Sequence, residues 1–225
     1  MDHGDSHIGV HHVVEFAGLA IHLDTMYMTW ITNAVVLLIA VLATRNIQPI
    51  PVSRWQGFIE MIAEGLLEQI TNTLGAKGKQ LAPLLITLFI FLVIANWLGL
   101  VPGFVSPTAD LNTTLGLAVM ISLATHVVGM TNKGVFPHLS HLFQPSVLFF
   151  PINLVEEFSK PITLAARLFG NIMAGEILLM ILNMLVPYLI PMAWVGFSIC
   201  VGIVQALVFT IMSISYFRSS FEEAH

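Results

Sequence analysis

The chain has 225 residues, of which 56% are hydrophobic and only 9% are charged. A soluble globular domain carries about 25% charged residues, so this composition excludes a soluble domain and predicts an all-α membrane protein. The formal net charge of −5 excludes little by itself, and the single cysteine, Cys200, excludes a disulfide framework.

Residues 1–25 form a polar segment that we expect to be an external tail. It contains five of the nine histidines: His3, His7, His11, His12 and His22. The first three are spaced by four residues and would form a metal-binding face if the segment were helical. We favour a solvated acidic tail without metal, because no neighbouring apolar segment fixes its geometry.

The first membrane span is predicted over residues 26–43, and the proline-rich sequence NIQPIPVSR follows it. Residues 55–74 predict a different kind of helix. Glu60, Glu64 and Glu68 repeat on one face, opposite a face of isoleucines and leucines. Because a membrane span would not carry three carboxylates, we expect this amphipathic helix to lie along the membrane surface or against a protein partner.

Two further spans are predicted over residues 81–101 and 113–130. The loop between them has Asp110 as its only charge, and His126 lies near the end of the later span. We interpret His126 as a hydrogen-bonded packing residue, since a lone histidine suits neither a haem nor a zinc site. The last two helices are expected within residues 151–217, with a break at VPYLIP and a final helix over 192–217.

The first of these two helices carries polar groups inside a strongly apolar stretch. Arg167 and Asn171 lie one helical turn apart, and Glu176 lies nine residues beyond Arg167, or about 13 Å along the axis. A charge at bilayer depth costs at least about 2.5–3.5 kcal/mol, so it is usually functional. Ala166, Gly170 and Ala174 form a stripe of small residues that allows a partner helix to approach closely. The pattern indicates ion handling next to a partner.

The length of this stretch is also informative. From residue 160 to 187 a helix would be about 40 Å long, whereas the hydrocarbon core is about 30 Å thick. We therefore expect a helix that tilts by roughly 40° or leaves the core in part.

Five crossings place the basic residues on one side of the membrane. Apart from Arg167, all lysines and arginines fall on the face opposite the N-terminus: Arg45, Arg54, Lys77, Lys79, Lys133, Lys160 and Arg218. The positive-inside rule then predicts an external N-terminus and a cytoplasmic C-terminus.

Several short motifs resemble the a subunit of rotary F-type ATP synthases. They are RLFGN at 167–171 with AGE at 174–176, preceded by EEFSKP, together with TADLNTT at 108–114 and QALVF at 205–209. The resemblance covers nearly the whole chain except the first 25 or so residues. It implies a stator subunit of the membrane sector, with a ring of c subunits, peripheral-stalk b subunits and lipid as partners, in an energy-transducing membrane such as a bacterial plasma membrane.

The resemblance also implies residue roles. Arg167 would gate the ion, and Glu176, Asn171 and Gln205 would line the external half-channel. Asp110 and Asn112 would mark the mouth of that half-channel, and Glu156 and Glu157 would mark the cytoplasmic exit. In some members of the family, the position seven residues before the glutamine is ionisable. Here it is Ser198, which leaves open whether Glu176 works with Ser198 or through water.

Other readings remain open at this point. A secondary ion-coupled transporter would use Arg167 and Glu176 as a substrate and coupling-ion pair, and a non-transporting assembly subunit would use these charges to join helices. The chain has no phosphate-binding loop, since GAKGK at 75–79 has the wrong spacing. We therefore expect no ATP catalysis, cofactor, metal or nucleic acid in this chain, and the ion is either H⁺ or Na⁺.

Overall fold

The computed structural model describes residues 13–16, 19–44, 54–101, 104–140, 147–186 and 189–221. Within these ranges five helical segments are long and apolar enough to cross a membrane, which confirms the all-α membrane class. The long helices are α1 (Leu23–Thr44), α2 (Arg54–Leu74), α3 (Ala82–Leu98), α4 (Leu111–Lys133), α6 (Phe150–Leu185) and α7 (Leu189–Phe221). Shorter elements are α5 (Val135–Ser140) and the 3₁₀ turns η1 (Ala76–Leu81), η2 (Pro107–Ala109) and η4 (Val147–Phe149).

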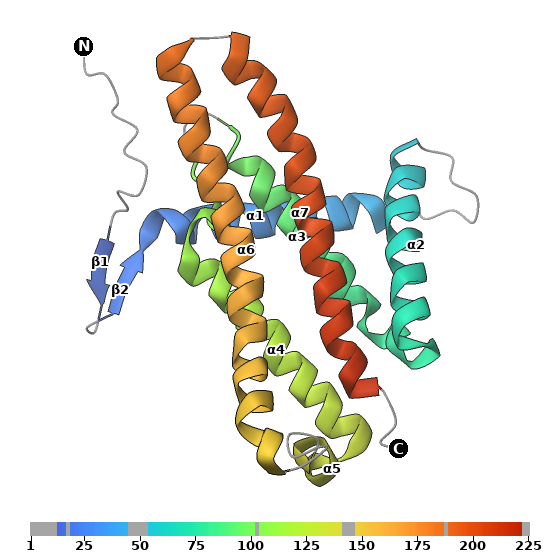
Figure 1. Ribbon diagram of the computed structural model, residues 1–225. Coiled ribbons are helices and arrows are strands. Elements are labelled where there is room, and N and C mark those ends of the chain that lie inside the picture. Colours follow the sequence, from blue (N-terminus) through green and yellow to red (C-terminus); the bar gives the residue numbers. More distant parts are fainter. Residues whose placement is uncertain are drawn as a thin grey trace.

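A small β-hairpin precedes α1 and was not predicted. Its strands, β1 (Val13–Phe16) and β2 (Leu19–His22), pair antiparallel with Val13 opposite His22. The hairpin lies within the segment expected to be an external tail and leads directly into α1 (Figure 1). The remaining tail histidines (His3, His7, His11 and His12) lie outside the described residues.

The predicted amphipathic helix is present as α2. Leu66, Ile70 and Leu74 are buried, whereas Glu64 and Glu68 are exposed. The apolar face packs against α7 and α3, so the helix is held by the rest of the chain. Its placement along the membrane surface stays a prediction.

The last two helices are longer than expected. α6 starts at Phe150 and continues through Pro161, whereas the length estimate from the sequence counted the helix only from residue 160. Proline removes one backbone hydrogen bond and usually ends a helix, but a membrane helix with well-packed neighbours tolerates it. α7 begins at Leu189 and places Pro191 in its first turn, where no intrahelical donor is lost. The 36 residues of α6 span about 54 Å.

The helices form layers around an apolar core. α6 and α7 run side by side as a long hairpin, α4 packs against both, α3 packs against α7, and α1 packs on α3 (Figure 1). In Figure 1, α1 passes behind the hairpin and crosses its direction steeply. Fully buried side chains from four helices meet in the core: Leu85, Leu92, Ile121, Leu168, Phe209 and Phe217.

Candidate functional site

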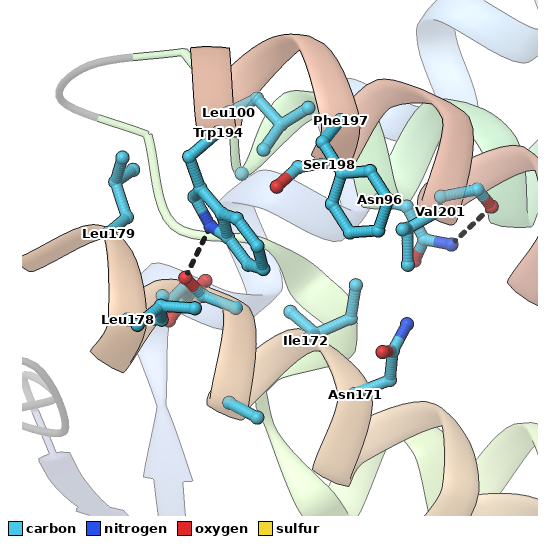
Figure 2. Close-up of a pocket in the computed structure, with 15 residues that line it drawn as sticks. Asn96, Leu100, Asn171, Ile172, Leu178, Leu179, Trp194, Phe197, Ser198 and Val201 are labelled. Carbon is cyan, nitrogen blue, oxygen red and sulfur yellow. Dashed lines mark hydrogen bonds between the residues drawn. The ribbon is translucent and has the colours of Figure 1, made fainter. Parts of the chain in front are cut away.

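A cavity of about 310 Å³ lies between α3, α6 and α7. Asn171 and Glu176 of α6 line it, together with Ser198 of α7 and Asn96 of α3. Figure 2 shows Asn171, Asn96 and Ser198 around the same space. The structure therefore brings together two of the predicted lining residues and the serine whose role the sequence left open.

Among the described residues that line the cavity, Glu176 is the only acidic one. Its side chain is partly buried, and it has no hydrogen bond or ion pair with any residue in the described ranges. A carboxylate withdrawn from water without a partner is costly, so stability alone does not explain this arrangement. The arrangement suits a group that exchanges an ion with water in the cavity.

Asn96 was missed by the sequence analysis. It is buried, donates from Nδ2 to the Gly202 carbonyl of α7 (3.0 Å), and accepts at Oδ1 from the Thr108 hydroxyl (2.9 Å). These bonds tie the turn η2 and helix α7 to the end of α3 that borders the cavity. The sequence did contain a signal for this residue, namely a single amide in an otherwise apolar span. A buried amide needs hydrogen-bond partners, so Asn96 could have been predicted to join α3 to another element.

Asp110 and Asn112 lie at the start of α4, close to the start of α1. Asp110 is buried, and its carboxylate accepts at Oδ2 from the Thr25 hydroxyl (3.0 Å) and at Oδ1 from the Asn112 backbone N–H (2.9 Å). The second bond makes Asp110 the N-cap of α4. Asn112 is exposed. The carboxylate of Asp110 therefore has a structural role that the sequence analysis did not anticipate.

Arg167 lies on the uncovered face of α6. Its side chain is exposed and makes no hydrogen bond or ion pair within the described part of the chain, although it lies within electrostatic range of the Tyr216 hydroxyl on α7. Ala166, Gly170 and Ala174 are exposed beside it, and a Cβ added to Gly170 would meet no atom within 4 Å. The charge thus faces outwards together with Ala166 and Gly170, and Ala174 also borders the cavity.

Gln205 is buried in α7, and it does not belong to the cavity lining. Its amide nitrogen has no hydrogen-bond acceptor among the described residues. No hydrogen bond joins Gln205 to Arg167 or Asn171 within those residues. A buried donor left unpaired costs about 1–3 kcal/mol, which makes this nitrogen a candidate for binding water.

A cluster of ion pairs lies far from the cavity, in the N-terminal half of α6. Glu157 contacts His126 Nε2 of α4 (3.2 Å) and Lys160 Nζ (3.0 Å), and the more exposed Glu156 contacts Lys160 Nζ (3.5 Å). The Tyr216 hydroxyl of α7 donates to the Lys160 carbonyl (3.4 Å). His126 thus pairs across two helices, as expected for a hydrogen-bonded packing residue.

The sequence is similar to those of known proteins over most of its length. Positions 26–218 match the family described as ATP synthase A chain. The chain is 43% identical over 208 residues to "ATP synthase subunit a" of Desulforamulus reducens, an alignment that covers 88% of this chain and 79% of the relative. Proteins of the same name from Trichlorobacter lovleyi (39%) and Geobacter sulfurreducens (37%) are each aligned over 90% of this chain and 89% of their own length. The motifs, the five apolar helices and these alignments agree, and the chain belongs to the ATP synthase subunit a family.

Proposed function

We propose that this chain is the ion-translocating stator subunit in the membrane sector of a rotary F-type ATP synthase. Its family and its five apolar helices support a role in the membrane sector of that complex. The proposal that this chain translocates ions against a rotating partner rests on one observation. Arg167 is a permanent cation on the uncovered face of a membrane helix, without an ion-pair partner in the described part of its own chain, beside a stripe of small residues.

The proposed partner of this face is a ring of c subunits, each with one carboxylate within the membrane. An ionised carboxylate cannot face lipid, so it must be neutralised or must face water or a cation. Arg167 would attract the ionised carboxylate, favour release of its ion, and block a direct ion path across the membrane. Arginine suits this role because it stays charged even when it is partly desolvated.

The cavity between α3, α6 and α7 is the proposed external half-channel. Glu176, Asn171 and Ser198 would line it, and Gln205 would bind water near its inner end. Asp110 and Asn112 would lie at its mouth, with Asp110 holding α4 and α1 together there. The shared cavity supports a path in which Glu176 works with Ser198 through intervening water.

The cytoplasmic exit is proposed at the other end of α6, near Glu156 and Glu157. Glu157 is ten residues before Arg167, or about 15 Å along the helix, so the two half-channels would end on opposite sides of the arginine. The exposed carboxylate of Glu156 is the more accessible of the two groups.

The remaining assignments follow from this role. We propose peripheral-stalk b subunits and lipid as further partners, a bacterial plasma membrane as the location, and an external N-terminus. The transported ion is H⁺ or Na⁺, with the choice made mainly by the ion site of the ring. No cofactor and no ATP catalysis are assigned to this chain.

The proposal is tested by Arg167→Ala in complexes first shown to be assembled with their ring. ATP synthesis should fall close to zero, because the attraction for the ring carboxylate is lost, while passive ion flux through the membrane sector should persist or rise. Arg218→Ala, which removes another exposed arginine at the end of α7, is the control and should retain synthesis. Near-normal synthesis by assembled Arg167→Ala complexes would disprove the mechanism. A secondary transporter predicts instead that the purified chain moves a solute without the ring.

A further inference from the structure

We infer that Trp194 is a positioning residue for Glu176. Its indole N–H links α7 to the backbone of Gly175 and thereby keeps the Glu176 side chain turned into the cavity. The inference rests on the proposed function, in which Glu176 takes up the ion from outside, and it assigns that uptake a residue from the other helix of the hairpin.

The linking contact is a hydrogen bond across the tip of the hairpin. Trp194 Nε1 donates to the Gly175 carbonyl oxygen at 3.2 Å. Figure 2 shows the indole extending from α7 towards α6, with this bond drawn as a dashed line. A carbonyl inside a helix has a second lone pair, so it accepts the indole without giving up its helical bond. The Trp194 ring also packs on Phe197, with ring centroids 5.2 Å apart, which restrains the indole.

Glu176 depends on its backbone for position. Its carboxylate has no partner within the described residues, so only the helix that carries it determines where it points. The outer end of α6 is weakly held, since Ile177, Ile181 and Met184 are all exposed. In the described ranges, the Trp194 bond is the one side-chain hydrogen bond that joins the outer halves of α6 and α7.

The cavity explains why the position of the Glu176 side chain matters for ion uptake. Trp194, Gly175, Glu176 and Ser198 all line it, so the bond lies in the wall of the proposed half-channel. A Cβ added to Gly175 would meet no atom within 4 Å, which leaves open space beside the bonded carbonyl. If the link were lost, the turn that carries Glu176 could move away from α7, and the distance across the cavity to Ser198 would change.

A matched control exists within the chain. Trp97 of α3 donates from Nε1 to the Ile199 carbonyl of α7 at 3.1 Å. It makes the same kind of bond to the same helix, but it is not a lining residue of the cavity. Trp97→Phe and Trp194→Phe therefore remove equivalent donors and retain an aromatic ring. Only Trp194→Phe alters the cavity wall.

The experiment measures ATP synthesis in vesicles as a function of the ion concentration on the external side, using assembled complexes. Trp194→Phe should raise the half-saturating concentration about threefold to tenfold, the effect of losing one hydrogen bond, while the maximal rate stays within about twofold. Trp97→Phe should leave the half-saturating concentration unchanged. Trp194→His retains an N–H donor and should recover part of the loss.

Combination with Glu176→Gln tests whether Trp194 acts through Glu176. Trp194→Phe should add no further change in a Glu176→Gln chain, because residues that act through one another are not additive. The inference would be overturned if Trp194→Phe and Glu176→Gln had additive effects, or if Trp194→Phe and Trp97→Phe had equal effects. It would also be overturned if the Trp194→Phe single variant failed to assemble. If Glu176→Gln slows transport but Trp194→Phe does not change the half-saturating concentration, only the inference about Trp194 is rejected. If Glu176→Gln transports ions at the normal rate, the proposed half-channel is rejected as well.

Discussion

Arg167 and Glu176 belong to one helix but have different surroundings. Nine residues correspond to two and a half helical turns, so the two side chains leave α6 on opposite faces. Arg167 is exposed on the face with the small-residue stripe, and Glu176 lies in the cavity next to α7. A single helix can therefore expose a charge on one face and place a carboxylate in a cavity on the other.

Glu176→Gln should slow ion transport by about tenfold or more and should leave assembly intact, because the amide preserves shape and polarity but cannot take up an ion. Glu176→Leu should be worse, since it also removes polarity from the cavity wall. Proton or sodium uptake into vesicles, normalised to assembled complex, provides the measurement. Asn171→Leu is a useful comparison because it makes the same wall less polar without removing a titratable group. Equal rates for parent and Glu176→Gln would refute a role for the carboxylate.

At the scale of the elements, α6 and α7 are too long to cross the membrane upright. A 54 Å helix confined to a 30 Å hydrocarbon core would have to tilt by about 55°. This exceeds the tilt of roughly 40° expected from the sequence, because α6 extends through Pro161 to Phe150. The steep crossing of α1 and the hairpin in Figure 1 agrees with an upright α1 and an oblique hairpin. An oblique hairpin can follow the curved surface of a ring.

Gly170 tests which face of α6 meets the partner. Gly170→Leu should be accepted by the isolated chain, since an added Cβ meets nothing within 4 Å, but it should block close approach of a ring helix. We expect loss of ring association, measured by co-purification. Gly116→Leu on α4 is the control, because Gly116 is also exposed and free of neighbours within 4 Å. Ring association that survives Gly170→Leu would place the partner on another face.

At the scale of the whole molecule, side-chain contacts join segments that the predicted topology puts on the same side. The starts of α1 and α4 meet through Thr25 and Asp110. At the other side, Lys133 of α4 donates to the Ser219 carbonyl of α7 (2.7 Å), and the Ser220 hydroxyl donates to the Thr125 carbonyl (2.8 Å). These contacts agree with five crossings in alternating directions.

Orientation in the membrane is testable with single cysteines in a Cys200→Ser background, which contains no other cysteine. Asn112→Cys should react with a membrane-impermeant thiol reagent only from outside the cell, and Thr131→Cys should react only from the cytoplasm. Both positions are exposed at opposite ends of α4. The reverse pattern of labelling would invert the proposed topology and would exchange the two half-channels.

The sequence by itself determined the membrane class, the five spans, and the helix that carries Arg167, Asn171 and Glu176. These features depend on hydropathy and on charges within an apolar run, which are properties of each segment alone. The amphipathic character of α2 was predictable for the same reason.

Only the tertiary structure decided which groups meet. Asn96 pairs with a carbonyl 106 residues away, Asp110 pairs with a threonine 85 residues away, and Trp194 reaches Gly175 across the hairpin. Such contacts depend on how separate helices pack, so no periodicity or local motif contains them. The continuation of α6 through Pro161 has the same cause, because neighbouring helices determine whether a membrane helix tolerates an interior proline.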